Sequence, residues 1–328
     1  MSSKKNSDIK HKTSVGGQAL LEGIMMQGPK GAYMSVRLPD GTIETEKQDF
    51  KRLKDRFRIA GLPVIRGVIT FIESMVFGFK CMTLSAEKAG IDTEQSTEDM
   101  SKLDKWITEH MGKKMMTVLT LIASVIGFSL AFLMFFYLPT LLVDLADKHL
   151  FSGAIKNFQP LIEGIIRMII FVVYIFAVSK VPDIKRVFMY HGAEHKSITC
   201  YEKGLELTVD NVRGQCRFHP RCGTSFIFVM LIISIVISSA LTLIFKGIND
   251  NRLIWVSIKM LIMPLVMGLG YEFIKYSGKH DNFVTKVLSA PGLLMQRITT
   301  VEPDDDIIEV GIDAIKAVIT ENPEDDAI

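Results

Sequence analysis

Long apolar runs dominate the middle of the chain. Residues 115–143 carry no charge over 29 positions, and residues 223–245 carry none over 23. A helix crosses a bilayer core about 30 Å thick with roughly 20 apolar residues. Because soluble core helices rarely run so long without polar positions, both runs are predicted to span a membrane.

Two further runs, residues 161–181 and 253–271, are predicted spans that contain charges. The first holds Glu163 and Arg167, and the second holds Lys259. Long side chains near one end of a span reach the lipid headgroups, so anchoring at the membrane surface is the simpler interpretation. A polar cavity near the outer face is the alternative.

The segment 59–84 is apolar apart from Arg66, Glu73 and Lys80, which are seven residues apart. This spacing places the three charges on one stripe of a helix. An amphipathic helix at the membrane interface, beginning near Pro63, is therefore predicted. A re-entrant half-helix is the alternative.

Polar patterns flank these runs. Residues 33–38 and 42–47 alternate around a Pro-Asp-Gly turn, which predicts a β-hairpin. The preceding stretch 16–29 is rich in glycine but lacks the Gly-Lys-Ser/Thr ending of a phosphate loop. Isoleucines at helical spacing within 304–319 predict an amphipathic helix near the C-terminus.

The predicted fold is a mainly α membrane protein. It has about four transmembrane helices, an interfacial helix, a small N-terminal β-hairpin and a cytoplasmic loop-and-helix domain. The expected segments are a disordered tail (1–13), the glycine-rich segment and hairpin (14–58), the interfacial helix (59–90), a linker (91–114), spans one and two (115–181), a His/Cys loop (182–224), spans three and four (225–272) and a C-terminal segment (273–328).

Charge sets the expected orientation, because cytoplasmic loops are enriched in Lys and Arg. One side of the spans carries more of these residues: Lys113, Lys114, Lys180, Lys185, Arg186, Arg217, Arg221, Lys275 and Lys279. We therefore expect a bacterial cytoplasmic membrane protein with both termini and the loop 182–224 in the cytoplasm. The net charge of +2 and the acidic segment 302–306 give no reason to expect a nucleic-acid partner.

The loop 182–224 carries the candidate chemistry. Pro182-Asp183 is a helix start signal, and His191 and His195 lie one turn apart on the apolar stripe of that helix. Two imidazoles at this spacing are suited to one divalent ion. The string 191–195 also fits the His-x-x-Glu-His pattern of inverted zincins, in which the glutamate, here Glu194, is the general base. Such a short pattern arises by chance, so kinship with those peptidases is not expected.

A second short motif precedes the third span. His219 and Cys222 have ligand-type spacing, and Thr224 or Ser225 is placed to cap the next helix. A helix N-terminus favours a thiolate at Cys222. With the paired histidines these residues form a plausible four-ligand site, for which zinc is the first choice. A buried polar cluster and a cysteine nucleophile assisted by histidine are the alternatives. Disulfides are not expected in a reducing cytoplasm.

Several longer strings resemble the YqhQ-like family of bacterial membrane proteins, a domain of unknown function often labelled a predicted metal-dependent enzyme. They are GGQALLEGIMMQGP at 16–29, PVIRG at 63–67, YHGAEHK at 190–196, HPRCGTSF at 219–226, PGLLMQ at 291–296 and TTVEPDD at 299–305. The resemblance implies that Glu22, His191, Glu194, His195, His219 and Cys222 occupy motif positions. Cys216 lies outside the motifs, and Gln27 stands where an arginine is expected.

The leading hypothesis is a cytoplasm-facing, metal-dependent hydrolase that acts on a lipid or a membrane protein. Its metal ligands are predicted to be His191, His195, His219 and Cys222, and its general base Glu194 or Glu22. A transporter or assembly factor with a structural metal or polar cluster is the alternative, because charges within spans often mark a pathway. An open coordination position separates the two, since structural zinc sites are closed by four ligands.

Overall fold

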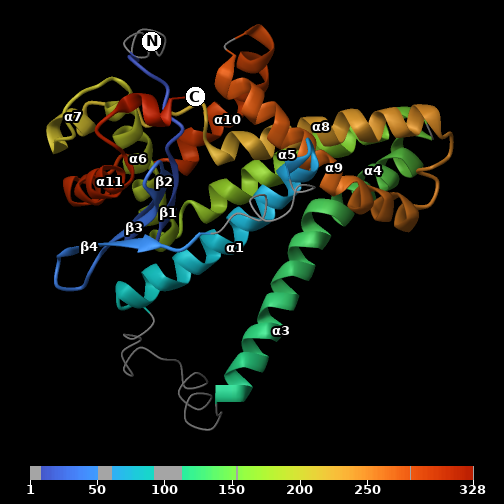
Figure 1. The fold of residues 1–328 in the computed structure, drawn as a ribbon. Coiled ribbons are helices and arrows are strands. Elements are labelled where there is room, and N and C mark those ends of the chain that lie inside the picture. The colour runs from blue at the N-terminus through green and yellow to red at the C-terminus, as the bar shows by residue number, and fades with distance from the viewer. Residues whose placement is uncertain (1–8, 51–60, 92–112, 153, 281, 328) are drawn as a thin grey trace. The chain divides into compact units, whose positions relative to one another are not determined.

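The computed structural model describes residues 9–50, 61–91, 113–152, 154–280 and 282–327 (Figure 1). Parts of the predicted tail and linker, residues 1–8 and 92–112, lie outside this described portion. The chain is mainly helical and divides into two compact units. The first unit comprises 1–91, 175–229 and 267–328, and the second comprises 92–174 and 230–266.

A four-stranded antiparallel sheet lies in the first unit. Its strands follow chain order: β1 (Gly16–Leu20), β2 (Gly23–Gly28), β3 (Gly31–Arg37) and β4 (Ile43–Gln48). The predicted hairpin is the β3–β4 half of this sheet, and Gly41 takes a positive φ of 86° in its turn. The glycine-rich segment, for which no strand was predicted, forms β1 and β2. Residues 23–26 of β2 are all buried, so the alternation that signals a strand is absent.

Helices cover both faces of the sheet. On one face Ile24 and Met26 pack against α6 (Pro182–Glu202) and α11 (Asp305–Val318). On the other, Leu20, Met25 and Met34 meet Phe77 and Cys81 of α1 (Ile65–Lys88). The predicted C-terminal amphipathic helix is thus confirmed as α11, and it fills the core between the sheet and α6.

Five helices among the described residues are long and apolar enough to cross a membrane. They are α1, the stretch Ile122–Phe151, α5 (Gln159–Val178), α8 (Gly223–Ile244) and α9 (Arg252–Lys279). The stretch Ile122–Phe151 joins α3 (Lys113–Phe132), the π-helical turn η3 (Leu133–Tyr137), α4 (Leu138–Ala146) and a second π-helical turn, η4 (Asp147–Phe151). Four such helices correspond to the predicted spans. The fifth, α1, forms the stretch for which an interfacial helix was predicted.

Shorter helices complete the chain. They are η5 (Lys156–Phe158), α7 (Val209–Arg213), α10 (Phe283–Thr299) and η6 (Pro323–Asp326). α10 begins with a capping box between Asn282 and Thr285. It contacts α8 where Gly292 meets Ser225, so closely that a Cβ at Gly292 would lie 2.4 Å from the Ser225 Cα. This contact fixes α10 beside the start of α8.

Two charged residues of the predicted spans, Glu163 and Lys259, are buried against each other in the second unit. Lys259 donates to Glu163 and to the Thr140 hydroxyl, each at 2.6 Å, and Trp255 donates to the same carboxylate at 3.3 Å. The Lys259 and Glu163 side chains are only 3% and 2% exposed. They therefore do not extend to the headgroups as the simpler interpretation of the sequence expected; they neutralise each other inside the unit.

Replacing Lys259 with methionine is expected to destabilise the protein by about 3–5 kcal/mol, because it leaves the Glu163 charge buried without its partner. The double change Glu163→Leu with Lys259→Met is the matched control. It removes both charges and is expected to recover most of the loss. Thermal unfolding in detergent measures both, and equal losses in the single and double variants would contradict the interpretation.

Candidate metal centre

Helix α6 carries two of the predicted ligands. It begins with Pro182 at its first position and Asp183 in its first turn, as the sequence predicted. From Gly192 onward every residue of the helix is buried, because α11, β1 and α7 pack around it. His191 and His195 lie one turn apart, with ring centroids 4.4 Å from each other.

Each imidazole is oriented by a backbone carbonyl. His191 Nδ1 lies 2.8 Å from the Thr299 carbonyl oxygen, and His195 Nδ1 lies 2.7 Å from that of Arg217. A carbonyl only accepts, so each Nδ1 donates a proton to it and each Nε2 is the nitrogen available to a metal ion. Second-shell bonds of this kind orient the histidine ligands of metal sites.

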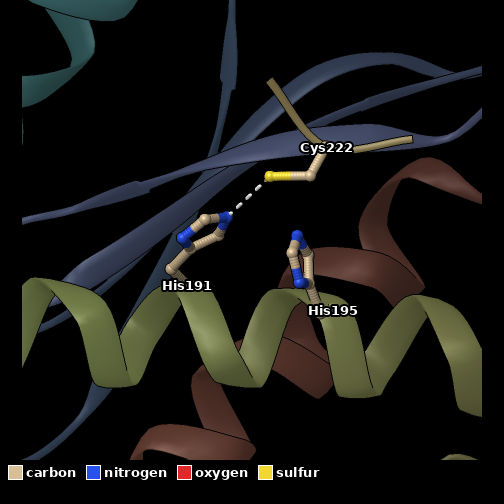
Figure 2. Close-up of side chains that lie close together, drawn as sticks. All are labelled: His191, His195 and Cys222. Atoms are coloured by element: carbon tan, nitrogen blue, oxygen red, sulfur yellow. Dashed lines mark hydrogen bonds between the residues drawn. The ribbon is translucent and has the colours of Figure 1, made fainter. Parts of the chain in front are cut away.

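Cys222 faces these imidazoles from the turn before α8. Its sulfur lies 3.2 Å from His191 Nε2, and Figure 2 shows both rings pointing from α6 toward it. The Thr224 backbone N–H and hydroxyl also contact the sulfur, at 3.5 and 3.3 Å. Ligand atoms of His191, His195 and Cys222 all lie within 4.8 Å of one another. Two imidazole nitrogens and a thiolate suit zinc by donor type.

The electrostatics of this cluster favour charge separation. Burial raises the pKa of Cys222, but the adjacent His195 and His191 outweigh it and hold that pKa well below its usual value. Burial lowers the pKa of His191, yet its interaction with the Cys222 thiolate raises it to about 9. Without a metal, the cluster is therefore an imidazolium–thiolate pair at neutral pH.

Glu194 lies beside the cluster and contacts the sheet. Its carboxylate lies against Gly17 of β1, with Oε1 3.2 Å from where a Cβ at Gly17 would be, and only 5% of the residue is exposed. Burial raises the pKa of Glu194 above its ordinary value. A carboxylate with a raised pKa is suited to moving protons near neutral pH.

His219, the fourth predicted ligand, is engaged elsewhere. Its Nε2 lies 3.4 Å from Glu202, a carboxylate that Arg221 also contacts. The amide of Gln296 donates to the His219 carbonyl and accepts from its N–H, each at 2.8 Å, which fixes the turn. His219 adjoins His195, with ring centroids 5.6 Å apart, but it is not part of the three-residue donor group.

Burial raises the pKa of Glu202, but its bonds with His219 and Arg221 outweigh that effect and lower it to about 2. Burial lowers the pKa of His219. The sequence analysis missed Glu202 and Gln296. Glu202 lies seven residues after His195 and so on the same face of α6, a spacing that offered a signal. Gln296 stands in a matched family motif, but its role depends on a turn 77 residues away.

Glu22, the second predicted base, has a different environment. It occupies the two-residue turn between β1 and β2 with a positive φ of 52°. Its carboxylate pairs with two guanidinium nitrogens of Arg186, and it accepts a hydrogen bond from the Tyr190 hydroxyl at 3.1 Å. These bonds offset the cost of a left-handed conformation, which is about 1–2 kcal/mol for an L-residue.

A cavity of about 800 Å³ opens onto the cluster. It is lined by His191, Glu194, His195, His219, Arg221, Cys222 and Thr224, and by residues 14–19 along β1. Glu22 and Cys216 are not among the lining residues. This volume is in the range of small-molecule sites. The arrangement therefore offers three soft or borderline ligands and one buried carboxylate to a molecule in the cavity.

Comparison with known proteins agrees with the motifs. The family described as "Protein of unknown function (DUF1385)" matches residues 62–321. This chain belongs to that family. It is also 33% identical over 315 residues to the "Uncharacterized protein YqhQ" of Bacillus subtilis (strain 168), a match that covers 94% of each chain. No solved structure matches. The predicted YqhQ-like relationship is confirmed, and with it a family whose function is not described.

Proposed function

We propose that this DUF1385 chain is a membrane-bound, zinc-dependent hydrolase that acts at the cytoplasmic face of a bacterial membrane. The observation that carries the proposal is the convergence of His191, His195 and Cys222 on the wall of a cavity that also contains Glu194. Three protein ligands leave a fourth position for chemistry, whereas structural zinc is closed by four. Five apolar helices support the membrane assignment.

The chemistry follows from the residues on the cavity wall. His191, His195 and Cys222 would hold the zinc ion, which would supply Lewis acidity and lower the pKa of a water molecule. Glu194 accepts a proton from the attacking water as its oxygen bonds to the substrate carbonyl carbon. The bond from that carbon to the leaving nitrogen or oxygen then breaks, and Glu194 returns the proton to the leaving atom.

The hydrogen bond between His191 and Cys222 favours a second candidate, a cysteine hydrolase in which His191 assists a Cys222 nucleophile. The anchored His195 argues for the metal, because a cysteine–histidine pair has no use for a second imidazole beside the sulfur. The transport or assembly alternative stays a prediction. The buried Glu163–Lys259 pair would serve it, but that pair is satisfied internally.

Purified full-length protein in detergent tests the proposal by elemental analysis and by hydrolysis of p-nitrophenyl acetate. We expect about one zinc per chain and an activity that a chelator removes and added Zn²⁺ restores. Activity that survives the chelator but is lost to iodoacetamide would favour the cysteine hydrolase. Protein that neither binds zinc nor hydrolyses the ester would overturn both.

Zinc affinity is expected to fall about tenfold for each pH unit below 9. The pKa of His191 is raised to about 9, so below that pH its proton must leave before the nitrogen can bind a metal. The pKa of Cys222 is lowered, so the thiolate adds no second proton near neutral pH. Competition with a chelating dye at pH 6, 7 and 8 measures the slope; an affinity that is constant over this range would contradict the assignment.

A further inference from the structure

The outer edge of β1 forms one side of the cavity. β1 is the first strand of the sheet, and no strand among the described residues pairs with its other edge; just before β1, Thr13 forms an isolated bridge with Ala327. Residues 14–19 all line the cavity, and Gly16 and Gly17 are exposed. An uncovered edge of this kind is a template for pairing with another extended chain.

The register of the hairpin shows which backbone groups face the cavity. The two-residue turn closes on the pair Leu20–Gly23, which is hydrogen-bonded in such hairpins, and bonded pairs alternate along the ladder. Gly17 and Ala19 therefore direct their N–H and C=O groups outward. The Glu194 carboxylate lies against Gly17 on this outer edge. The Gly17 carbonyl and both backbone groups of Ala19 remain for a ligand.

The small side chains of β1 permit the close approach of another backbone. Gly16, Gly17 and Ala19 present almost no side chain along the edge, and glycine within a strand often marks a place where another backbone approaches. Apolar side chains farther along the wall, Val187 and Phe188 on α6, would contact alternate residues of such a chain. Small residues at the strand and apolar ones opposite it suit an extended peptide.

Charge argues against a phosphorylated ligand. Besides its histidines, the cavity wall has Arg221, Glu194 and Asp325 as its charged side chains. Arg221 is paired with Glu202, so the wall presents no free cluster of cations for a phosphate group. A neutral peptide backbone does not need such a cluster of cations.

We propose that the ligand of this cavity is an extended polypeptide that adds to β1 as a fifth strand, so that the enzyme is a peptidase. This inference rests on the proposed hydrolase. Glu194 Oε1 lies 3.2 Å from where a Cβ at Gly17 would be, so a chain paired with β1 lies against the general base. Water adds to a peptide carbonyl, the C–N bond breaks, and Glu194 carries the proton to the departing amine, which gives a carboxylate and an amine.

The test begins with β-casein, which is largely unstructured, incubated with the zinc-loaded full-length protein. Mass spectrometry is expected to show defined cleavage products that a chelator prevents. A ten-residue peptide spanning one cleavage site is then N-methylated at one backbone position at a time. Binding to the Glu194→Gln variant is expected to weaken about tenfold at every second position near the site and hardly at all between them, since strand addition uses alternate amides.

Variants of the strand provide a second readout. Ala19→Pro removes one outward N–H and is expected to weaken peptide binding about tenfold while zinc content stays at the parental level. Ala19→Ser keeps that N–H and is the matched control. If the proline variant fails to fold, the N-methyl series decides alone.

Failure of the peptidase inference can be told apart from failure of the hydrolase. Zinc-dependent hydrolysis of p-nitrophenyl acetate without casein cleavage, or fatty acid release from phosphatidylglycerol vesicles instead, would overturn the peptide assignment and leave the hydrolase standing. N-methyl effects without a period of two would overturn strand addition. Absence of both zinc and esterase activity would count against the hydrolase, and peptide binding would still report on the β1 edge.

Discussion

Replacing Cys222 with serine, or His191 with alanine, is expected to reduce the zinc content of the purified protein from about one ion per chain to nearly none. Each change removes one of three converging ligands, and two ligands rarely hold zinc against a buffer. The loss should be larger for Cys222, because the thiolate supplies the negative charge of the donor set.

The matched control for this prediction is His219→Ala. The sequence predicted His219 as a ligand alongside the other three residues. In the structure, however, the Nε2 of His219 faces Glu202 rather than the cluster. We therefore expect this variant to retain most of its zinc. Elemental analysis of the three variants, with circular dichroism to confirm folding, makes the comparison. Loss of zinc in His219→Ala would restore a four-ligand site, which is typical of structural zinc.

The helical part of the site followed from sequence because its periodicity is local. A period of 3.6 residues places His191 and His195 on one face of α6, whatever surrounds that helix. The helix N-terminus after Cys222 was also visible, from the apolar run that follows it, but α8 begins at Gly223, so Thr224 and Ser225 lie inside its first turn and do not cap it as predicted. Both signals lie within a few residues of the atoms concerned.

The part of the site that could not be predicted from the sequence depends on contacts between distant segments. The role of His219 is decided by Glu202 and Gln296, and that of Glu22 by Arg186, 164 residues away. β1 and β2 carried no strand signal because glycines and two buried faces remove the alternation. The contact between Gly17 and Glu194, which links the sheet to the site, depends on both strands.

Replacing Glu194 with glutamine is expected to lower kcat/KM for p-nitrophenyl acetate by a factor of about 10² to 10⁴, the usual contribution of a general base. Zinc content should not change, because Glu194 is not among the converging donors. The amide of glutamine fills the same space, so the fold is expected to survive. Activity and zinc measured on one preparation separate loss of the base from loss of the metal.

Glu22→Gln distinguishes between the two bases that the sequence left exchangeable. Glu22 does not line the cavity and is held by Arg186 and Tyr190, so this variant should keep near-parental kcat/KM. It should instead lose stability, by about 1–3 kcal/mol, because the bonds that hold a left-handed turn residue are weakened. A large loss of activity in Glu22→Gln together with an active Glu194→Gln would exchange the two roles. That outcome would also mean that the general base does not lie at the edge of β1 on which peptide recognition depends, because it is Glu194 that lies against Gly17 of β1.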